Sequence, residues 1–304
     1  METSTTTYHK PVLLHQSVAG LNINPCGTYV DVTFGAGGHS KAILQQLDEK
    51  GRLFAFDQDE DAIKNSIDNH RFTLIHANFR HIKRFLKLHE VEKVDGILAD
   101  LGVSSHQIDN QERGFSTRFD CQLDMRMDKR KSFTATDILN TYEEKDLSRV
   151  FYQYGEVKNA RKLAFEIVKE RKNQEIASSK QFIEIIQKHI PKQRENKYLA
   201  QLYQALRIEV NRELEALQEF LLQSIDLLNT GGRLLIISYH SLEDRMVKQF
   251  MRSGNMEDKI KKDFYGNPLT PFHLITRKAI VPDENEMIEN PRSRSAKLRI
   301  AEKK

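Results

Sequence analysis

A glycine-rich turn between an expected strand and an expected helix is the first feature that could do chemistry. Residues 29–40 read YVDVTFGAGGHS, in which β-forming residues end at three glycines and an amphipathic segment follows. Glycines let the backbone bend sharply and approach a ligand closely, and a helix start offers N–H groups. Nineteen residues after Gly38, Asp57 ends a second apolar run, where its carboxylate can accept hydrogen bonds from ribose hydroxyls. This spacing predicts a pocket for a nucleoside-bearing cofactor.

The glycine pattern distinguishes two classes of cofactor. The dinucleotide fingerprint G-x-G-x-x-G requires a third glycine at the position that Ser40 occupies. The run instead resembles the first motif of class I S-adenosylmethionine-dependent methyltransferases, D-x-G-x-G-x-G, with Thr33 in place of the first glycine. S-adenosylmethionine has no pyrophosphate to cradle, so a looser glycine pattern suits it. The stretch therefore favours a methyltransferase over a dehydrogenase.

Strands that alternate with helices must position these residues. This alternation predicts an α/β fold with a parallel, doubly wound sheet, here the Rossmann-like sheet of class I methyltransferases. Strands are expected near residues 29–34, 53–57, 71–77, 94–100, 233–239, 273–280 and 295–301, with the last one antiparallel. Ligands bind at the carboxyl ends of such strands, so one edge should collect Gly35–His39, Asp57, Phe79 and Asp100.

The pattern changes after Asp100, which indicates an inserted domain. A loop of small residues is followed by helical periodicity from Thr136 to about Ile190, with Lys and Arg between the apolar positions. We expect residues 106–200 to form a helical substrate-recognition domain and residues 1–105 and 201–304 to form the methyltransferase domain. One long helix is expected from Gln201 to Leu228, ended by Gly231 and Gly232, and residues 1–10 read as a loose arm.

Composition limits the class of protein. No apolar run reaches the roughly 18 residues of a membrane span, and the N-terminus lacks an apolar signal region, which favours a cytoplasmic protein without a membrane partner. Two cysteines and eleven histidines without metal-ligand spacing predict no metal site. Residues 106–205 hold 19 Lys and Arg against 15 Asp and Glu, whereas the rest holds 28 of each. The excess is either an ordinary solvated surface or one that meets phosphates.

The methyl acceptor sets the remaining chemistry. Methylation of carbon 5 of a pyrimidine needs a cysteine nucleophile, but Cys26 precedes the first strand and Cys121 lies in the insert without an obvious base. An exocyclic amine needs only a nearby proton acceptor and apolar or aromatic walls. Asp100 stands where amine methyltransferases carry D/N-P-P-Y/F, although the sequence here is DLGV.

Three residues that we expect at the carboxyl edge of the sheet each have two or more interpretations. Asp100 is a candidate catalytic residue and a candidate cofactor or substrate ligand, and its alternative role is to cap the loop. Phe79 is either a core residue or a platform for adenine. Tyr239, with His240 and Ser241, either lines the substrate entrance or closes the sheet.

The chain as a whole resembles the bacterial 16S ribosomal RNA cytosine-N4 methyltransferase family (RsmH, also called MraW). The similarity covers nearly the whole length in eight ordered runs. These runs are residues 9–14 (HKPVLL), 31–40 (DVTFGAGGHS), 95–105 (DGILADLGVSS), 113–116 (RGFS), 123–128 (LDMRMD), 205–214 (ALRIEVNREL), 238–245 (SYHSLEDR) and 290–295 (NPRSRS). One local departure is Lys197–Ala200, where many members carry His-Pro-Ala-Thr.

The resemblance implies a cytoplasmic enzyme that uses S-adenosyl-L-methionine to methylate the N4 amine of a cytosine in the decoding centre of the small ribosomal subunit. Its 16S rRNA would be the partner, and a homodimer is left open. The implied cofactor contacts are Gly37, Gly38, His39, Asp57, Phe79, Asp100 and Gln107. Two alternatives are a methyltransferase with another acceptor and an RNA-binding ribosome-assembly factor without turnover.

Overall fold

The computed structural model describes residues 11–304, and these residues form two compact units. We call the first the sheet unit, which contains the chain up to Gly102 together with Leu214–Lys304. We call the second the helical unit, Val103–Glu213. The expected arm at residues 1–10 and the start of the HKPVLL run lie outside the described residues.

Seven strands of the described residues form one sheet in the order β3-β2-β1-β4-β5-β7-β6. The first five run parallel to one another, and β7 is antiparallel to both β5 and β6. This is the class I methyltransferase arrangement, so the predicted fold is confirmed. The strands are β1 (Thr28–Asp31), β2 (Arg52–Asp57), β3 (Phe72–His76), β4 (Val94–Asp100), β5 (Leu228–Ser238), β6 (Phe272–Leu274) and β7 (Lys297–Lys303).

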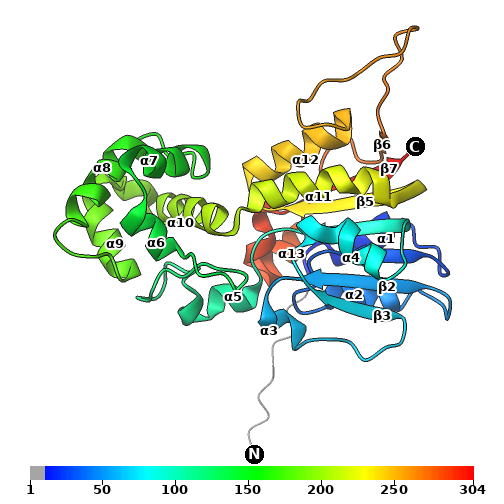
Figure 1. Cartoon of the computed structure of the whole chain (residues 1–304), viewed down its shortest axis with the longest axis horizontal. Helices are drawn as coiled ribbons and strands as arrows, with labels where there is room; N and C mark the ends of the chain where they lie inside the picture. Colours follow the sequence, from blue (N-terminus) through cyan, green and yellow to red (C-terminus); the bar gives the residue numbers. More distant parts are fainter. Residues whose placement is uncertain (1–10) are drawn as a thin grey trace, which may run out of the picture. The chain divides into compact units, whose positions relative to one another are not determined.

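Helices cover both faces of this sheet (Figure 1). Neighbouring strand residues point to opposite faces, so Val30 joins one apolar core and Tyr29 the other. The first core is completed by α4 (Ile82–Leu88), α11 (Glu213–Leu227) and α12 (Ser241–Ser253), and the second by α1 (Leu14–Leu21) and α2 (Gly38–Leu44). The shorter helices of this unit are α3 (Glu60–Ile63) and α13 (Glu284–Glu289).

Several boundaries differ from the sequence-based prediction. The strand expected over 273–280 is only the three residues of β6. Gly231 and Gly232 lie inside β5 instead of ending the preceding helix. Gly231 has a φ of +81°, and the pairing of β4 with β5 shifts register between Val94 and Gly96. The glycines therefore form an irregularity within a strand, a role that sequence alone does not separate from a helix stop.

The long helix expected over 201–228 is two helices. The first, α10 (Glu195–Asn211), ends where Arg212 adopts a left-handed conformation with a φ of +51°, and α11 begins directly after it. The apolar periodicity continues across the break, but Leu206 packs in the core of the helical unit and Leu217 in that of the sheet unit. Apolar periodicity indicates which residues of a helix are buried, but it does not indicate which of two cores buries them. The break between α10 and α11 therefore cannot be predicted from this pattern.

The helical unit has its own apolar core, to which every one of its longer helices contributes. Ser178 caps α9, and α6 begins at Ala135 behind a Thr134 cap, one residue before the helical periodicity that is expected from Thr136. Since α10 packs into this core, the unit extends to Glu213, beyond residue 200. Its helices are α5 (Ser105–Asp109), α6 (Ala135–Thr141), α7 (Glu144–Gln153), α8 (Ala160–Glu170), α9 (Ser179–Ile186) and α10. Among the described residues, no helix combines the length and apolar character that crossing a bilayer demands.

Asn211 links the end of α10 to the loop before α6. Its buried side chain accepts a hydrogen bond from the Met127 N–H at 2.8 Å and donates to the Met125 carbonyl at 2.7 Å. We expect Asn211→Ala to lower the free energy of unfolding by about 2–4 kcal/mol, because two buried backbone groups lose their partners. Urea unfolding measures this loss, with the exposed Asn173→Ala as the matched control. Equal stability of the two variants would contradict the role of Asn211.

Candidate active site

The carboxyl ends of the parallel strands bring most of the predicted residues to one edge of the sheet. Asp31, Asp57 and Asp100 are the last residues of β1, β2 and β4. The glycine turn follows β1, and Phe79 begins a short 3₁₀ turn, Phe79–His81, after β3. Hydrogen bonds and close contacts between these segments make them one site, as the parallel topology predicts.

Backbone conformation and close packing explain the glycine turn. Gly35 and Gly37 have φ values of +54° and +77°, which L side chains rarely adopt. A Cβ on Gly38 would lie 2.1 Å from Cγ of Pro11, whereas a Cβ on Gly35 would meet no atom of residues 11–304 within 4 Å. Gly38 is therefore needed because a side chain there would clash with Pro11. The open space on the Cβ side of Gly35 is where the turn can receive a ligand.

The buried carboxylate of Asp31 holds the turn in place. It accepts hydrogen bonds from the Ser40 hydroxyl at 2.7 Å and from the Thr33 N–H at 3.1 Å. Burial raises the pKa of Asp31, and these two donors partly offset the effect. Asp31 is thus a positioning residue of the edge, a role that the sequence reasoning missed although it quoted the run that contains it.

Asp57 connects the end of β2 to the glycine turn. One carboxylate oxygen accepts the Gly35 N–H at 2.8 Å and the other accepts the Asp59 N–H at 2.9 Å. The side chain is half-buried, and burial raises its pKa to about 6. Each oxygen retains a further lone pair, so the carboxylate can still accept hydrogen bonds from a ligand.

Asp100 lies within a cluster of polar groups. One of its oxygens accepts a hydrogen bond from the Tyr239 hydroxyl at 2.8 Å, and the other lies 3.8 Å from Nδ1 of His39. The Thr33 hydroxyl accepts the Asp100 N–H at 2.6 Å. Thr33, which stands in place of the first glycine of the general methyltransferase motif, therefore fixes the backbone of Asp100, the candidate catalytic residue.

The cluster is arranged to hold one proton. Nε2 of His39 lies 3.2 Å from the Val12 carbonyl, which can only accept, so Nε2 carries the ring hydrogen. Burial lowers the pKa of His39, which keeps Nδ1 unprotonated toward Asp100. Burial also raises the pKa of Asp100 to about 6, while the hydrogen bond from the Tyr239 hydroxyl favours its charged form. Asp100 is thus the group in this cluster that readily takes up a proton near neutral pH.

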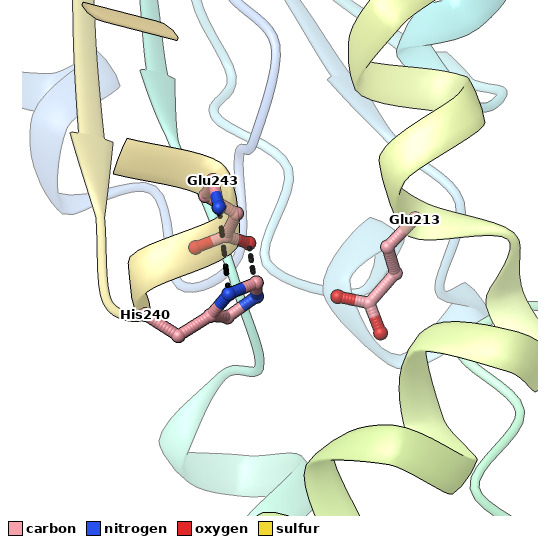
Figure 2. Close-up of side chains that lie close together, drawn as sticks. All are labelled: Glu213, His240 and Glu243. Carbon is pink, nitrogen blue, oxygen red and sulfur yellow. Dashed lines mark hydrogen bonds and ion pairs between the residues drawn. The ribbon is translucent and has the colours of Figure 1, made fainter. Parts of the chain in front are cut away.

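The start of α12 fixes the backbone of Tyr239 through Glu243, whose contacts with His240 are drawn in Figure 2. The carboxylate of Glu243, whose side chain is only 4% exposed, accepts the Tyr239 N–H at 3.1 Å. The Glu243 N–H in turn approaches Nδ1 of His240 at 3.5 Å, and Nε2 of His240 lies 3.1 Å from the same carboxylate. These contacts orient the backbone that presents Tyr239 to Asp100, so His240 and Glu243 are positioning residues.

The structure shows the core role of Phe79 and leaves part of its ring accessible. Its ring packs edge-on against Phe220, with ring centroids 5.5 Å apart and planes at 67°. The ring is only partly buried. Phe79 is therefore anchored to the core by one edge and retains accessible surface at the site, and its contact with adenine stays a prediction.

Comparison with known proteins decides the family. The sequence matches the model of the MraW methylase family over residues 6–304. The ribosomal RNA small subunit methyltransferase H of Bacteroides thetaiotaomicron is 59% identical over 304 residues, the full length of both chains. The protein of the same name from Flavobacterium johnsoniae is 58% identical over 301 residues, 99% of each chain. The chain belongs to the MraW methylase family. It is a methyltransferase, and S-adenosyl-L-methionine is its cofactor.

The remaining residue that the family resemblance implies, Gln107, belongs to the helical unit. It is buried there at the start of α5, where its side-chain oxygen accepts the Ser104 N–H at 3.0 Å and its own N–H donates to the Ser104 hydroxyl. This capping box gives Gln107 a structural role in the MraW chain. Its contact with the cofactor stays a prediction.

Tyr239 is the residue whose part in this MraW site the sequence analysis did not identify. Nothing in the local pattern around it distinguishes a residue that lines an entrance from one that bonds to Asp100. The signal that could have found it is the SYHSLEDR run, which ends β5 beside the end of β4. Parallel neighbours place the residues after Asp100 and after Ser238 at the same edge.

Proposed function

We propose that this methyltransferase modifies the exocyclic N4 amine of a cytosine in the decoding centre of 16S rRNA, within the small ribosomal subunit and in the cytoplasm. The observation that carries the proposal is the half-buried Asp100 carboxylate, which the Tyr239 hydroxyl holds beside the unprotonated nitrogen of His39 and which offers a proton acceptor suited to an amine. The names of the relatives, which specify small-subunit ribosomal RNA, support the substrate class. The proposal applies equally to a monomer and a homodimer.

The residues of the edge fit the cofactor. S-adenosylmethionine, when bound, supplies an electrophilic methyl group on a positively charged sulfur. The open space above Gly35 and the half-buried carboxylate of Asp57 provide room and hydrogen-bond acceptors for its nucleoside part. Asp57 and Asp100 place two carboxylates at the same edge, and negative charge favours a sulfonium ligand. Gly37, Gly38, His39 and Phe79 would complete the binding site.

The chain's own part in the reaction is to take the proton that the amine loses. Transfer of the cofactor's methyl group to N4 would oblige the amine to release one proton, which a residue of the chain would take up. We assign that proton to Asp100, whose pKa of about 6 leaves most of the carboxylate charged at neutral pH. Tyr239 and Thr33 hold Asp100 in position through their hydroxyls.

The cysteines disfavour methylation at carbon 5. The Cys26 thiol precedes β1, at the opposite end of the strand from Asp31, and donates to Asp48 at 2.8 Å. This hydrogen bond raises the pKa of Cys26, which makes the thiolate nucleophile less available. Cys121 lies in the helical unit, and burial raises its pKa as well. Cys26 is therefore not placed to add to a base at the carboxyl edge of the sheet, and the raised pKa of Cys121 makes its thiolate less available.

Nucleoside analysis tests the proposed reaction. Labelled S-adenosylmethionine is incubated with the protein and small ribosomal subunits that lack the modification, and the RNA is then digested to nucleosides. Label in N4-methylcytidine supports the proposal. Label in another nucleoside or in protein would show that the enzyme methylates a different acceptor. No label despite measurable cofactor binding would favour the assembly factor without turnover.

We propose that the helical unit recognises the RNA substrate. Arg161 and Lys162 lie exposed at the start of α8 and Lys172 lies exposed just after it, and none of the three forms an ion pair within residues 11–304. We expect reversal of all three charges to weaken subunit binding at low salt and to lower the salt slope by about 2–3, because phosphate contacts release counterions.

A matched variant separates this effect from a change in total charge. Lys50, Arg84 and Lys87 are exposed residues of the sheet unit, and reversing their charges changes the net charge equally. Filter binding to small subunits between low and high salt measures both variants. An unchanged affinity and salt slope for the helical-unit variant would show that these three residues do not meet phosphate.

A further inference from the structure

Two aromatic side chains are almost fully exposed at the tip of a hairpin between α12 and β6. The hairpin comprises residues 257–271, and the exposed fractions are 97% for Phe264 and 86% for Tyr265. Their rings lie 5.6 Å apart at 87° to each other. Figure 1 shows this segment, in orange, extending away from the helices and strands of the sheet unit. Exposed aromatic surface of this size stabilises nothing within the chain, and such surface marks an interaction site.

The hairpin is built to present this tip. Lys262 and Pro268 form an antiparallel bridge, and the Leu269 N–H donates to the Lys261 carbonyl at 2.8 Å. At the turn, the Asp263 carboxylate accepts the N–H groups of Tyr265 and Asn267 at 2.9 and 2.8 Å. The Asn267 side-chain amide also donates to Asp263 at 3.0 Å, and this hydrogen bond together with the backbone ones lowers the pKa of Asp263, so the carboxylate stays charged at neutral pH.

Positive charge flanks the aromatic tip. Lys261 and Lys262 are exposed, and neither forms an ion pair with any residue that the structure describes. The neighbouring acids are already engaged, since Asp258 pairs with Arg252 and Glu257 with Lys259. Asp263 is occupied by the turn. Exposed aromatic rings beside unpaired lysines are the combination that stacks on unpaired bases and meets their phosphates.

The hairpin lies at the edge of the sheet opposite the candidate active site. Since β7 is antiparallel to both neighbours, β6 runs parallel to β5. Phe272, the first residue of β6, therefore lies at the end of the sheet away from Asp57 and Asp100. A residue at the tip cannot take part in methyl transfer at the carboxyl edge, so its contribution would be to binding alone.

We propose that the 257–271 hairpin is a second RNA-docking element, in which Phe264 and Tyr265 stack on unpaired bases of the small-subunit RNA and Lys261 and Lys262 contact adjacent phosphates. This inference rests on the proposed function for the identity of the RNA. It adds an anchor remote from the reacting base. The enzyme would thus hold its substrate at two places, and loss of the hairpin contact would raise KM without lowering kcat.

The test compares full-length variants on small ribosomal subunits. We expect Phe264→Ala with Tyr265→Ala to weaken binding at least about fivefold for each base that loses its platform, and so about 25-fold for the pair. Phe264→Leu with Tyr265→Leu keeps the apolar surface and should lose as much, because leucine cannot stack. Lys261→Gln with Lys262→Gln should lower the salt slope by about 1.4–1.8. Leu88→Ala with Leu222→Ala, two other exposed apolar residues of the sheet unit, is the matched control.

Three outcomes would overturn the proposal. One is wild-type KM and affinity in the alanine pair, and another is full binding by the leucine pair, which would indicate an apolar groove on a protein. The third comes from replacing Tyr265 with photoreactive benzoylphenylalanine: a crosslink to RNA supports the proposal, and a crosslink to a ribosomal protein or to a second copy contradicts it. Nucleoside analysis of the wild type is scored separately, so a different methylated nucleoside would overturn the proposed function while the hairpin's effect on KM is still measured.

Discussion

Asp100→Asn is expected to lower the single-turnover rate of methyl transfer by about 10²–10⁴-fold at saturating cofactor and substrate, the usual contribution of a positioned proton acceptor. Asparagine keeps the size of the side chain and can still accept the Tyr239 hydroxyl, but it cannot take up a proton. Calorimetry with the cofactor separates the two roles assigned to Asp100. A variant that turns over normally once saturated would make Asp100 a binding residue only.

The pH dependence of the wild type provides a second view of the same group. Burial raises the pKa of Asp100 to about 6, so the carboxylate is protonated and unable to accept below that value. The rate should rise with pH up to about 6 and then level off. Tyr239→Phe removes a donor that favours the charged form, so it should shift the rise to higher pH and restore the rate there. An unshifted profile would show that the Tyr239 hydroxyl does not control Asp100.

The stability of the Asp100 variant checks that the loss of rate is not unfolding. The folded-state pKa of Asp100 is raised above its ordinary value of 3.8, so the charge opposes folding. The stability that the protonated form contributes is present below about pH 4 and is lost as pH rises through about 6. Asp100→Asn should therefore be at least as stable as the wild type at pH 7. Urea unfolding at pH 5 and pH 7 measures the difference.

Asp57→Ala is expected to weaken cofactor binding by about 1.5–3 kcal/mol, because a charged acceptor for ribose hydroxyls is lost. The structure adds a second cause, since the same carboxylate holds the Gly35 and Asp59 N–H groups. Asp57→Asn retains an acceptor with less disturbance of the turn and should fall between the wild type and the alanine variant. Calorimetry measures all three, and the exposed Asp68→Ala is the matched control.

Cofactor affinity should also depend on pH through Asp57. Burial raises its pKa to about 6, and the protonated form offers a weaker acceptor and no charge. Affinity should therefore fall as pH drops through about 6, and the fall should be smaller in Asp57→Asn. If the alanine variant binds as tightly as the wild type, Asp57 holds the turn and does not contact the cofactor.

The two carboxylates explain why one edge of the sheet can both bind and react. Asp57 is fixed by backbone N–H groups, which suits a group that must stay in place. The Asp100 carboxylate accepts a hydrogen bond from the Tyr239 hydroxyl and lies 3.8 Å from Nδ1 of His39, which suits a group that exchanges a proton. Burial thus raises the pKa of both Asp57 and Asp100 to about 6, whereas their different hydrogen-bond partners suit them to different roles.

The sequence by itself determined the sheet, the glycine turn and the edge at which Asp57 and Asp100 meet. Apolar runs, turn glycines and helical periodicity are local patterns, and the rules for parallel strands convert their order into a shared edge. These patterns predict both ends of β4 correctly and predict Gly37 and His39 at the same edge as the two carboxylates. The family resemblance then supplied the chemistry.

Only the tertiary structure decided three features of the same chain. The break at Arg212 depends on two cores burying successive helices, and the Tyr239–Asp100 hydrogen bond joins residues 139 positions apart. The third is the bare aromatic tip at Phe264, whose residues alone do not differ from a buried pair. Each depends on which segment lies beside which, a relation between distant parts of the chain that local pattern cannot encode.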